Sequence, residues 1–149
     1  MRAIIQRVKE ASVSVNGESV SSIGRGLLIL VGFHKEDSDT DSDYIINKST
    51  GLRIFEDNNG LMNLSVSDVD GEILVVSQFT LYGDSRKGKR PSFSTSMPPA
   101  EALQFYNNFV NRFRENFGSL KCGVFGADME VSLVNSGPVT IILDSSKIL

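Results

Sequence analysis

The sequence predicts one α+β domain over residues 1–149, with mostly antiparallel sheets and two main helices. Strand-like segments gather at the beginning and the end of the chain and do not alternate regularly with helices, which disfavours a doubly wound parallel sheet. The length of 149 residues favours a single domain, and no repeat or linker-like stretch divides the chain.

The first predicted elements are strands. Residues 4–8 form a mixed first strand, and residues 12–15 alternate serine with valine before Asn16-Gly17. Asn-Gly after an alternating run predicts a tight hairpin, because both residues tolerate the positive φ of a type I′ turn. The continuous apolar run LLILVGF at 27–33 predicts a strand that is buried on both faces.

A helix is predicted over residues 41–52, because acidic side chains stabilise the positive end of a helix dipole. Five acids lie within residues 36–43. We interpret this run as a solvated helix start. A metal site is the less favoured alternative, because the spacing lacks the glycine and the final glutamate of an EF-hand.

Residues 73–81 predict another strand, entered by a turn at Asp70-Gly71. Pro98-Pro99 opens the second helix, because proline is tolerated in a first turn, and Gly118 is a natural residue just after its end. This helix has an apolar stripe that we expect in the core. The stripe consists of Ala102, Tyr106, Phe109, Val110, Phe113 and Phe117.

The last predicted strands cover residues 129–135 and 139–143, with Ser136-Gly137-Pro138 between them. Proline cannot donate a ladder hydrogen bond, so a turn or a bulge is expected there. From the residue types alone, a trans Gly-Pro bond is the default, since only about 5–6% of X-Pro bonds are cis.

The residue counts exclude several classes of site. One cysteine and one histidine allow neither an intramolecular disulfide nor a Cys/His zinc cage, and no phosphate-binding glycine motif is present. The counts do not exclude a carboxylate-rich site for magnesium or calcium, but we expect no metal and no cofactor. The chain begins without a signal-peptide pattern, and its longest apolar stretch is too short to span a bilayer. We therefore expect a cytoplasmic protein with no membrane partner.

Three features of the sequence have both a plain and a chemical interpretation. His34 ends the apolar strand and is either a half-exposed structural residue or a catalytic base, and Cys122 is either a small packed side chain or a nucleophile. Polar residues at 77–81 close a strand, where backbone N–H groups can hold a developing oxyanion. The plain interpretation is favoured for each of them on pattern alone.

The charge distribution is uneven. A net charge of −3 argues against a nucleic-acid partner, yet residues 82–91 carry four bases against one acid. These bases are Arg86, Lys87, Lys89 and Arg90, and glycines at 83 and 88 give the loop freedom to follow a phosphate backbone. A solvated loop is the equal alternative.

Taken together, these segments resemble the D-aminoacyl-tRNA deacylase family over the whole chain. SQFTL at 77–81 and NSGPVT at 135–140 match the family's two motifs in the right order, and RKGKRPSF at 86–93 and FGADM at 125–129 also resemble family segments. The resemblance implies an α+β fold with a barrel-like core. It also implies an enzyme that hydrolyses the ester between a D-amino acid and tRNA, and that releases glycine mischarged on alanine tRNA.

The resemblance further implies a homodimer without a DNA partner. In the family, the bond that matches Gly137-Pro138 is cis and reaches into the active site of the other subunit. There its carbonyl oxygens hold the substrate amino group and its bulk excludes an L side chain. Arg7 matches the arginine that supports this gate, while Phe125 and Met129 are expected near the adenosine.

The resemblance leaves the role of Ser77, Gln78, Phe79 and Thr80 open between two mechanisms. In one, Thr80 is a nucleophile and needs a base, for which only His34 offers an imidazole. In the other, which we favour, the ribose 2′-hydroxyl assists and N–H groups around Phe79 stabilise the oxyanion, while Ser77 and Gln78 shape the pocket. The arginines and lysines of the basic loop are expected to bind tRNA.

Two rival functions remain. One is an RNA-binding module without catalysis, which predicts binding through the basic loop and no turnover. The other is a hydrolase of small acyl esters that uses His34, which predicts activity on esters without RNA. Neither explains why the Gly137-Pro138 segment accompanies the SQFTL segment.

Overall fold

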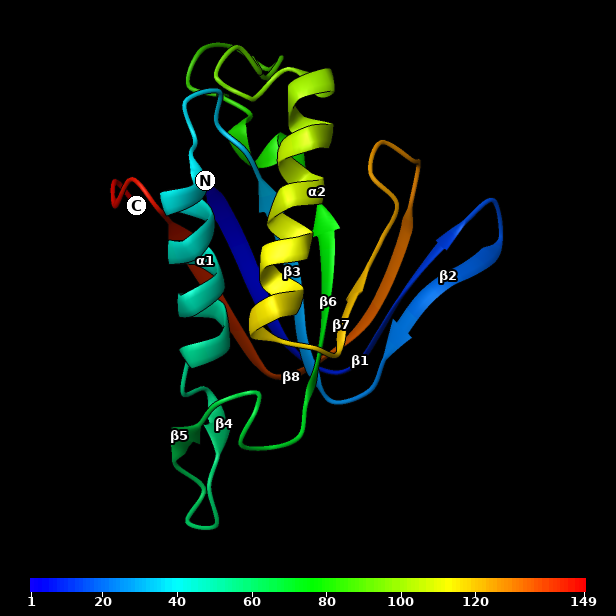
Figure 1. Cartoon of the computed structure of the whole chain (residues 1–149), viewed down its shortest axis with the longest axis vertical. Coiled ribbons are helices and arrows are strands. Elements are labelled where there is room, and N and C mark those ends of the chain that lie inside the picture. Colours follow the sequence, from blue (N-terminus) through cyan, green and yellow to red (C-terminus); the bar gives the residue numbers. More distant parts are fainter.

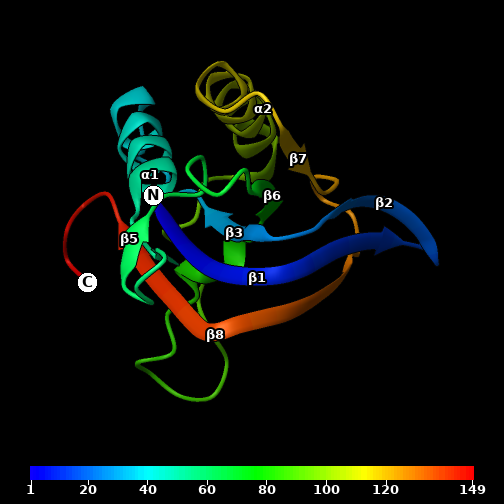
Figure 2. The same cartoon turned by 90° about the horizontal axis from the view of Figure 1, so that it is seen from below.

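One curved mixed sheet forms the centre of the structure, and both helices cover the same face of it (Figures 1 and 2). The computed structural model describes all 149 residues. Its elements in chain order are β1 (Arg2–Val15), β2 (Glu18–Ile23), β3 (Gly26–Gly32), α1 (Asp39–Gly51), β4 (Phe55–Glu56), β5 (Met62–Leu64), β6 (Glu72–Ser77), the 3-10 helix η1 (Phe79–Tyr82), α2 (Pro99–Asn116), β7 (Leu120–Cys122) and β8 (Glu130–Asp144).

Strand β1 organises the sheet. It pairs antiparallel with β8 along one edge and with β3 and then β2 along the other. Strand β6 pairs parallel with β3 and with β7, and these two crossovers contain α1 and α2. The remaining pair, β4 with β5, is antiparallel, so the prediction of mostly antiparallel strands is confirmed.

The sheet almost closes into a barrel, because its two ends meet. Strand β2 lies at one end of the order β2-β1-β3-β6-β7 and β7 at the other. Ser21 Oγ donates to the carbonyl of Cys122 at 2.8 Å, and Lys121 Nζ donates to the carbonyl of Ser22 at 2.6 Å. Seven buried side chains fill the interior: Val8, Ala11, Val13, Ile23, Leu28, Leu74 and Val76.

A second and larger core lies between the sheet and the helices. Strand β3 contributes to both cores, with Leu28 in the barrel and Leu27 and Ile29 under the helices, which confirms a strand buried on both faces. All six members of the predicted α2 stripe are buried. The helix ends at Asn116 with Phe117 as its C-cap, so Gly118 lies just after the end as predicted, although its φ is not positive.

The predicted turns are confirmed. Asn16 and Gly17 have φ values of 52° and 78°, as a type I′ hairpin requires. Asp70 has a φ of 53°, and the N–H of Gly71 donates to the carbonyl of Val66 at 2.8 Å.

Helix α1 begins two residues earlier than predicted because Ser38 forms a capping box with Asp41. The Ser38 N–H donates to Asp41 Oδ2 at 2.8 Å. Serine followed three residues later by an acid is a helix-start signal that the sequence itself contains.

Two predicted boundaries are wrong, and both concern the site. The strand predicted over 73–81 ends at Ser77, and η1 replaces its last residues. The two strands predicted around residue 137 form the single strand β8, whose pairing with β1 is irregular between Gln6 and Glu10. A bulge rather than a turn therefore accommodates Pro138.

Neither helix has the length and apolar character needed to cross a membrane.

Candidate active site

A cavity of about 630 Å³ opens where β3 and β6 end. Val76 and Ser77 of β6, Gln78, and Phe79 of η1 form one wall, and the segment from Phe125 to Val131 forms another. Eleven of its 18 lining residues are hydrophobic, and none carries an ionisable side chain. An apolar cavity with a few polar groups at its mouth is the usual form of a small-ligand site.

The polar groups at the mouth belong to the start of η1. The N–H of Gln78 donates to the carbonyl of Val31 at 2.7 Å, which extends the β3–β6 pairing by one step. The first N–H groups of a helix have no acceptor inside it, and no side chain caps η1. Phe79 lines the cavity, and its N–H, the first of the helix, has no helical partner. This arrangement suits a ligand oxygen.

Thr80 is exposed and does not line the cavity. Its hydroxyl accepts a hydrogen bond from Gln78 Nε2, and this amide is its only side-chain partner. An amide cannot take a proton from the hydroxyl, so the geometry around Thr80 lacks the base that a nucleophile needs.

His34 stabilises the turn that follows β3. Its N–H donates to Asp37 Oδ2 at 2.7 Å, and its Nδ1 accepts the N–H of Glu36 at 3.2 Å. The ring lies 5.4 Å from the ring of Tyr82 and does not line the cavity. The interpretation of His34 as a half-exposed structural residue is therefore favoured, since 27% of its side chain is exposed.

Cys122 is half-buried, and burial raises the pKa of its thiol, which opposes the thiolate form. It is a packed side chain of β7 rather than an activated nucleophile.

Arg2 holds η1 in place, and sequence reasoning missed it. Its Nη1 donates to the carbonyl of Leu81 at 3.1 Å, and its guanidinium carbon lies 4.7 Å from the centre of the Tyr82 ring. Asp144 Oδ2 lies 3.7 Å from Nε of the same arginine. No local pattern signals this role, because the partners are about 80 and 140 residues away in sequence.

Phe125 and Met129 both line the cavity. The Phe125 ring centre is 5.4 Å from that of Tyr106 on α2. The N–H of Val124 donates to the sulfur of Met129 at 3.3 Å, so the segment folds back on itself and carries both side chains to one wall.

The Gly137-Pro138 bond is cis, and both residues are exposed. Arg7 is buried beneath them, where its Nε donates to the carbonyl of Ser136 at 3.0 Å and its Nη1 to that of Ile54 at 2.6 Å. Gly137 has a φ of 126°, and a Cβ there would lie 2.9 Å from Arg7 Nη2. Only glycine therefore fits above this arginine.

Gly137 and Pro138 lie away from the cavity of their own chain. Neither they nor Arg7 line it. Gly137 is six positions along β8 from Val131, which does line it, and an extended strand covers about 20 Å over that length. The structure thus brings Ser77, Gln78, Phe79, Phe125 and Met129 together and leaves Gly137, Pro138 and Arg7 apart.

The basic loop follows η1 and is exposed from Ser85 to Thr95. Arg86 is the one base of the four that has an ion-pair partner, Asp84, with Nη2 2.6 Å from Oδ2. Hydrogen bonds from Arg86 lower the pKa of Asp84 to about 2. Lys87, Lys89 and Arg90 have no carboxylate partner, so their charges are available to a ligand.

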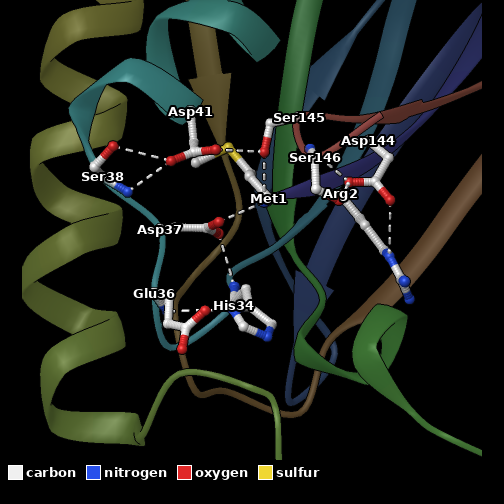
Figure 3. A network of polar contacts seen from close by, with 10 residues as sticks. All are labelled: Met1, Arg2, His34, Glu36, Asp37, Ser38, Asp41, Asp144, Ser145 and Ser146. Carbon is white, nitrogen blue, oxygen red and sulfur yellow. Dashed lines mark hydrogen bonds and ion pairs between the residues drawn. The ribbon is translucent and has the colours of Figure 1, made fainter. Parts of the chain in front are cut away.

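The acidic run is not simply solvated, and that prediction is wrong for Asp37 (Figure 3). Its carboxylate is 6% exposed and pairs with the α-ammonium of Met1. Asp41 accepts hydrogen bonds from Ser38 and from Ser145 Oγ, the latter at 2.6 Å, and Asp43 pairs with Arg112 at 2.6 Å. Except for Ser38, these partners come from distant segments, which the sequence of the run does not reveal.

Comparison with known proteins decides the family. The model described as D-Tyr-tRNA(Tyr) deacylase matches residues 4–144. Proteins named D-aminoacyl-tRNA deacylase from Thermotoga petrophila and Thermosipho africanus are each 55% identical over 148 residues, which cover 99% of each chain. The chain belongs to the D-aminoacyl-tRNA deacylase family. The resemblance at the two motifs and the expected class of enzyme are thereby confirmed.

Solved structures confirm the deacylase fold. A protein titled c-Myc DNA Unwinding Element Binding Protein matches with a TM-score of 0.92 and 44% identity over 97% of this chain and 98% of that one. A probable eukaryotic D-amino acid tRNA deacylase matches with a TM-score of 0.82 and 18% identity over 95% and 97% of the two chains. The second likeness supports the barrel-like α+β fold alone.

Proposed function

We propose that this chain hydrolyses the ester that joins a D-amino acid to the 3′ end of tRNA, and so removes D-amino acids before translation uses them. The observation that carries the proposal is the cavity bounded by Ser77, Gln78 and Phe79 in a chain of this family. Its size and apolar walls suit an aminoacyl group and an adenosine. The activity belongs in the cytoplasm, where charged tRNA is used.

The proposed mechanism needs no side-chain nucleophile. Water attacks the ester carbonyl carbon, the carbonyl oxygen becomes an oxyanion, and the N–H of Phe79 donates to it. The ribose 2′-hydroxyl orients the water or gives a proton to the departing 3′-oxygen, so the products are a free amino acid and tRNA with its 3′-hydroxyl restored. The absence of ionisable side chains from the cavity and the amide partner of Thr80 support this mechanism.

A second copy of the chain completes the proposed site. Gly137 and Pro138 are exposed on β8, away from their own cavity, and are fixed from below by Arg7. In a homodimer they enter the partner's cavity, where their carbonyl oxygens accept hydrogen bonds from the substrate amino group. An L side chain would then collide with this rigid backbone, and discrimination by collision works for many side chains.

The same gate explains a second substrate. Glycine has no side chain, so a barrier that acts by collision with a side chain does not exclude it. We therefore propose that glycine mischarged on alanine tRNA is also hydrolysed.

The basic loop binds tRNA in this proposal. Arg86, Lys87, Lys89 and Arg90 lie directly after η1 in the chain, so they reach phosphates near the 3′ end. No duplex DNA partner is expected, because the cavity requires an unpaired end.

The decisive experiment compares the release of D-tyrosine and of L-tyrosine from their tRNA esters. Release of the D-amino acid alone supports the proposal. Equal rates on both, or no hydrolysis of the D-ester, contradict it.

The shared site is tested by mixing two inactive chains. Gly137→Ala removes the gate, and Ser77→Trp fills the cavity mouth. A heterodimer of these two chains contains one intact site made of both, so activity reappears on mixing if the gate acts in the partner. Absence of recovery, with heterodimers demonstrated, contradicts that arrangement.

Nucleic-acid binding without turnover is a second candidate. The basic loop favours it, and so does the solved relative titled as a DNA unwinding element binding protein. This candidate predicts that the chain binds charged tRNA or duplex DNA and leaves the D-ester intact. Titration of both nucleic acids beside the release assay separates the two functions.

A further inference from the structure

Two exposed phenylalanine rings stand together at the mouth of the cavity. Phe79 is 58% exposed and Phe93 is 39% exposed, and both residues line the cavity. Their ring centres are 5.1 Å apart, with planes at 62°. One ring belongs to η1 and the other to the returning limb of the basic loop, so the pair joins the two elements.

The structure fixes the position of Phe93. Two backbone hydrogen bonds between Asp84 and Ser92, of 2.8 and 2.9 Å, close the neck of the loop. The N–H of Ser96 donates to the carbonyl of Phe93 at 3.0 Å. A Cβ at Gly83 would lie 3.0 Å from Cε1 of Phe93, so glycine allows the ring to lie against the backbone.

The surroundings of the pair indicate the chemistry of its ligand. The pair lines an apolar cavity, and the exposed loop that contains Phe93 also carries Lys87, Lys89 and Arg90, whose charges have no partner within the chain. Single-stranded nucleic acid combines flat nucleobases, which stack on aromatic rings, with phosphates, which pair with lysine and arginine side chains. An acidic peptide would engage the lysines but would leave the two exposed rings without a matching surface.

We propose that the Phe79–Phe93 pair is a stacking platform for the unpaired nucleotide that precedes the terminal adenosine of the tRNA. The inference rests on the proposed function, since it takes the aminoacyl-adenosine to occupy the cavity. The next base along the strand then meets the exposed rings, and the phosphates beyond it reach the loop. The platform reads no sequence, because every base has a stacking face.

The test compares two substrates in Phe93→Ala. From the usual cost of replacing a base-stacking aromatic residue by alanine, we expect kcat/KM on D-tyrosyl-tRNA to fall by about 5- to 150-fold. D-tyrosyl-adenosine lacks the preceding nucleotide, and its kcat/KM should change by less than about threefold. Phe93→Trp should retain activity on tRNA, whereas Phe93→Leu, which keeps apolar bulk without a π face, should not.

Two further measurements sharpen the test. Leu103→Ala, which alters an exposed apolar residue on α2, is the matched control and should affect neither substrate. In tRNA with 2-aminopurine before its terminal adenosine, binding should quench the fluorescence, and Phe93→Ala should abolish that quenching.

The outcomes are distinguishable. An equal loss on both substrates means that Phe93 only shapes the cavity, and it overturns the inference, as does no loss on either. If the unaltered chain hydrolyses neither ester, the proposed function fails. The fluorescence experiment still tests stacking in that case, and unaltered quenching in Phe93→Ala overturns the inference.

Discussion

The α-ammonium nitrogen of Met1 lies 2.5 Å from Oδ1 of Asp37, and both groups are almost completely buried. Oδ2 of the same carboxylate accepts the N–H of His34, and the ammonium also donates to Ser145 Oγ at 2.7 Å. One buried charge pair thus joins the start of β1, the end of β3, the approach to α1 and the residue after β8 (Figure 3).

Removing either charge of this pair should destabilise the fold. Breaking a buried pair on one side costs about 3–5 kcal/mol, because the remaining charge is left without a partner. Asp37→Asn is expected to lower the free energy of unfolding by this order in urea denaturation. Glu36→Gln, at a side chain that is 81% exposed, is the control and should have little effect.

Acetylation of the Met1 amino group tests the pair from its other side. The neutral amide should reproduce most of the loss seen in Asp37→Asn. Acetylation should lower the free energy of unfolding of the Asp37→Asn chain by much less than it lowers that of the unaltered chain, because the two changes remove the same interaction. Simple addition of the two losses would show that the pair contributes nothing.

Arg2→Ala should reduce activity more than it reduces stability. The substitution removes the hydrogen bond to Leu81 O and the contact with the Tyr82 ring, each worth about 1 kcal/mol, so η1 loses its support. We expect kcat/KM on D-tyrosyl-tRNA to fall about tenfold. Arg2→Lys keeps the charge but not the planar guanidinium group, so it should recover only part of the lost kcat/KM. Unchanged kinetics would show that η1 holds its position without Arg2.

Gly137→Ala should impair the gate. The new Cβ would lie 2.9 Å from Arg7 Nη2, and the φ of 126° is strained for alanine by about 1–3 kcal/mol. Either Gly137 or the arginine must move, which displaces the carbonyl oxygens proposed to hold the substrate amino group, so D-tyrosine release should be lost. The control is Gly60→Ala, at a glycine whose φ is also positive, 75°, but which lies in the β4–β5 turn with nothing near its Cβ, and this variant should release D-tyrosine as the unaltered chain does.

Neutralising Lys87 and Lys89 should weaken binding to all tRNAs alike. Each lost phosphate contact is expected to reduce the slope of log K against log salt by about 1. Arg86→Ala provides a comparison within the same loop and should have the smaller effect, since Arg86 is already paired with Asp84. An unchanged salt slope in the double lysine variant would mean that the loop is merely solvated.

Thr80→Ala should retain most of its activity, because its hydroxyl contacts an amide and no base. Single-turnover rates on D-tyrosyl-tRNA measure this directly. A loss of three orders of magnitude or more, at about the scale of a missing nucleophile, with binding intact, would favour a threonine nucleophile.

Local patterns were sufficient for the elements that local forces determine. The Asn16-Gly17 hairpin, the doubly buried strand β3 and the α2 stripe all follow from turn chemistry and periodicity. Cavity residues such as Phe79 and Phe125 were identified through family motifs rather than through their own chemistry. The η1 turn was missed because its polar residues follow a strand without a break in pattern.

The support of the site depends on contacts between distant segments. The roles of Arg2 and Asp37 arise from partners at the other end of the fold, and one of these partners, the α-ammonium, is not a side chain at all. The position of Phe93 beside Phe79 depends on how the basic loop closes at its neck. Each requires the three-dimensional structure to be seen.

The lack of any ionisable side chain around the cavity has a kinetic consequence. A bell-shaped pH profile records the protonation of an enzyme's acid and base, and this cavity supplies neither. If the proposed mechanism holds, the dependence of rate on pH comes from the substrate, through its own amino group and the reactivity of its ester. A pH–rate profile of the enzyme would then report the protonation and reactivity of its substrate.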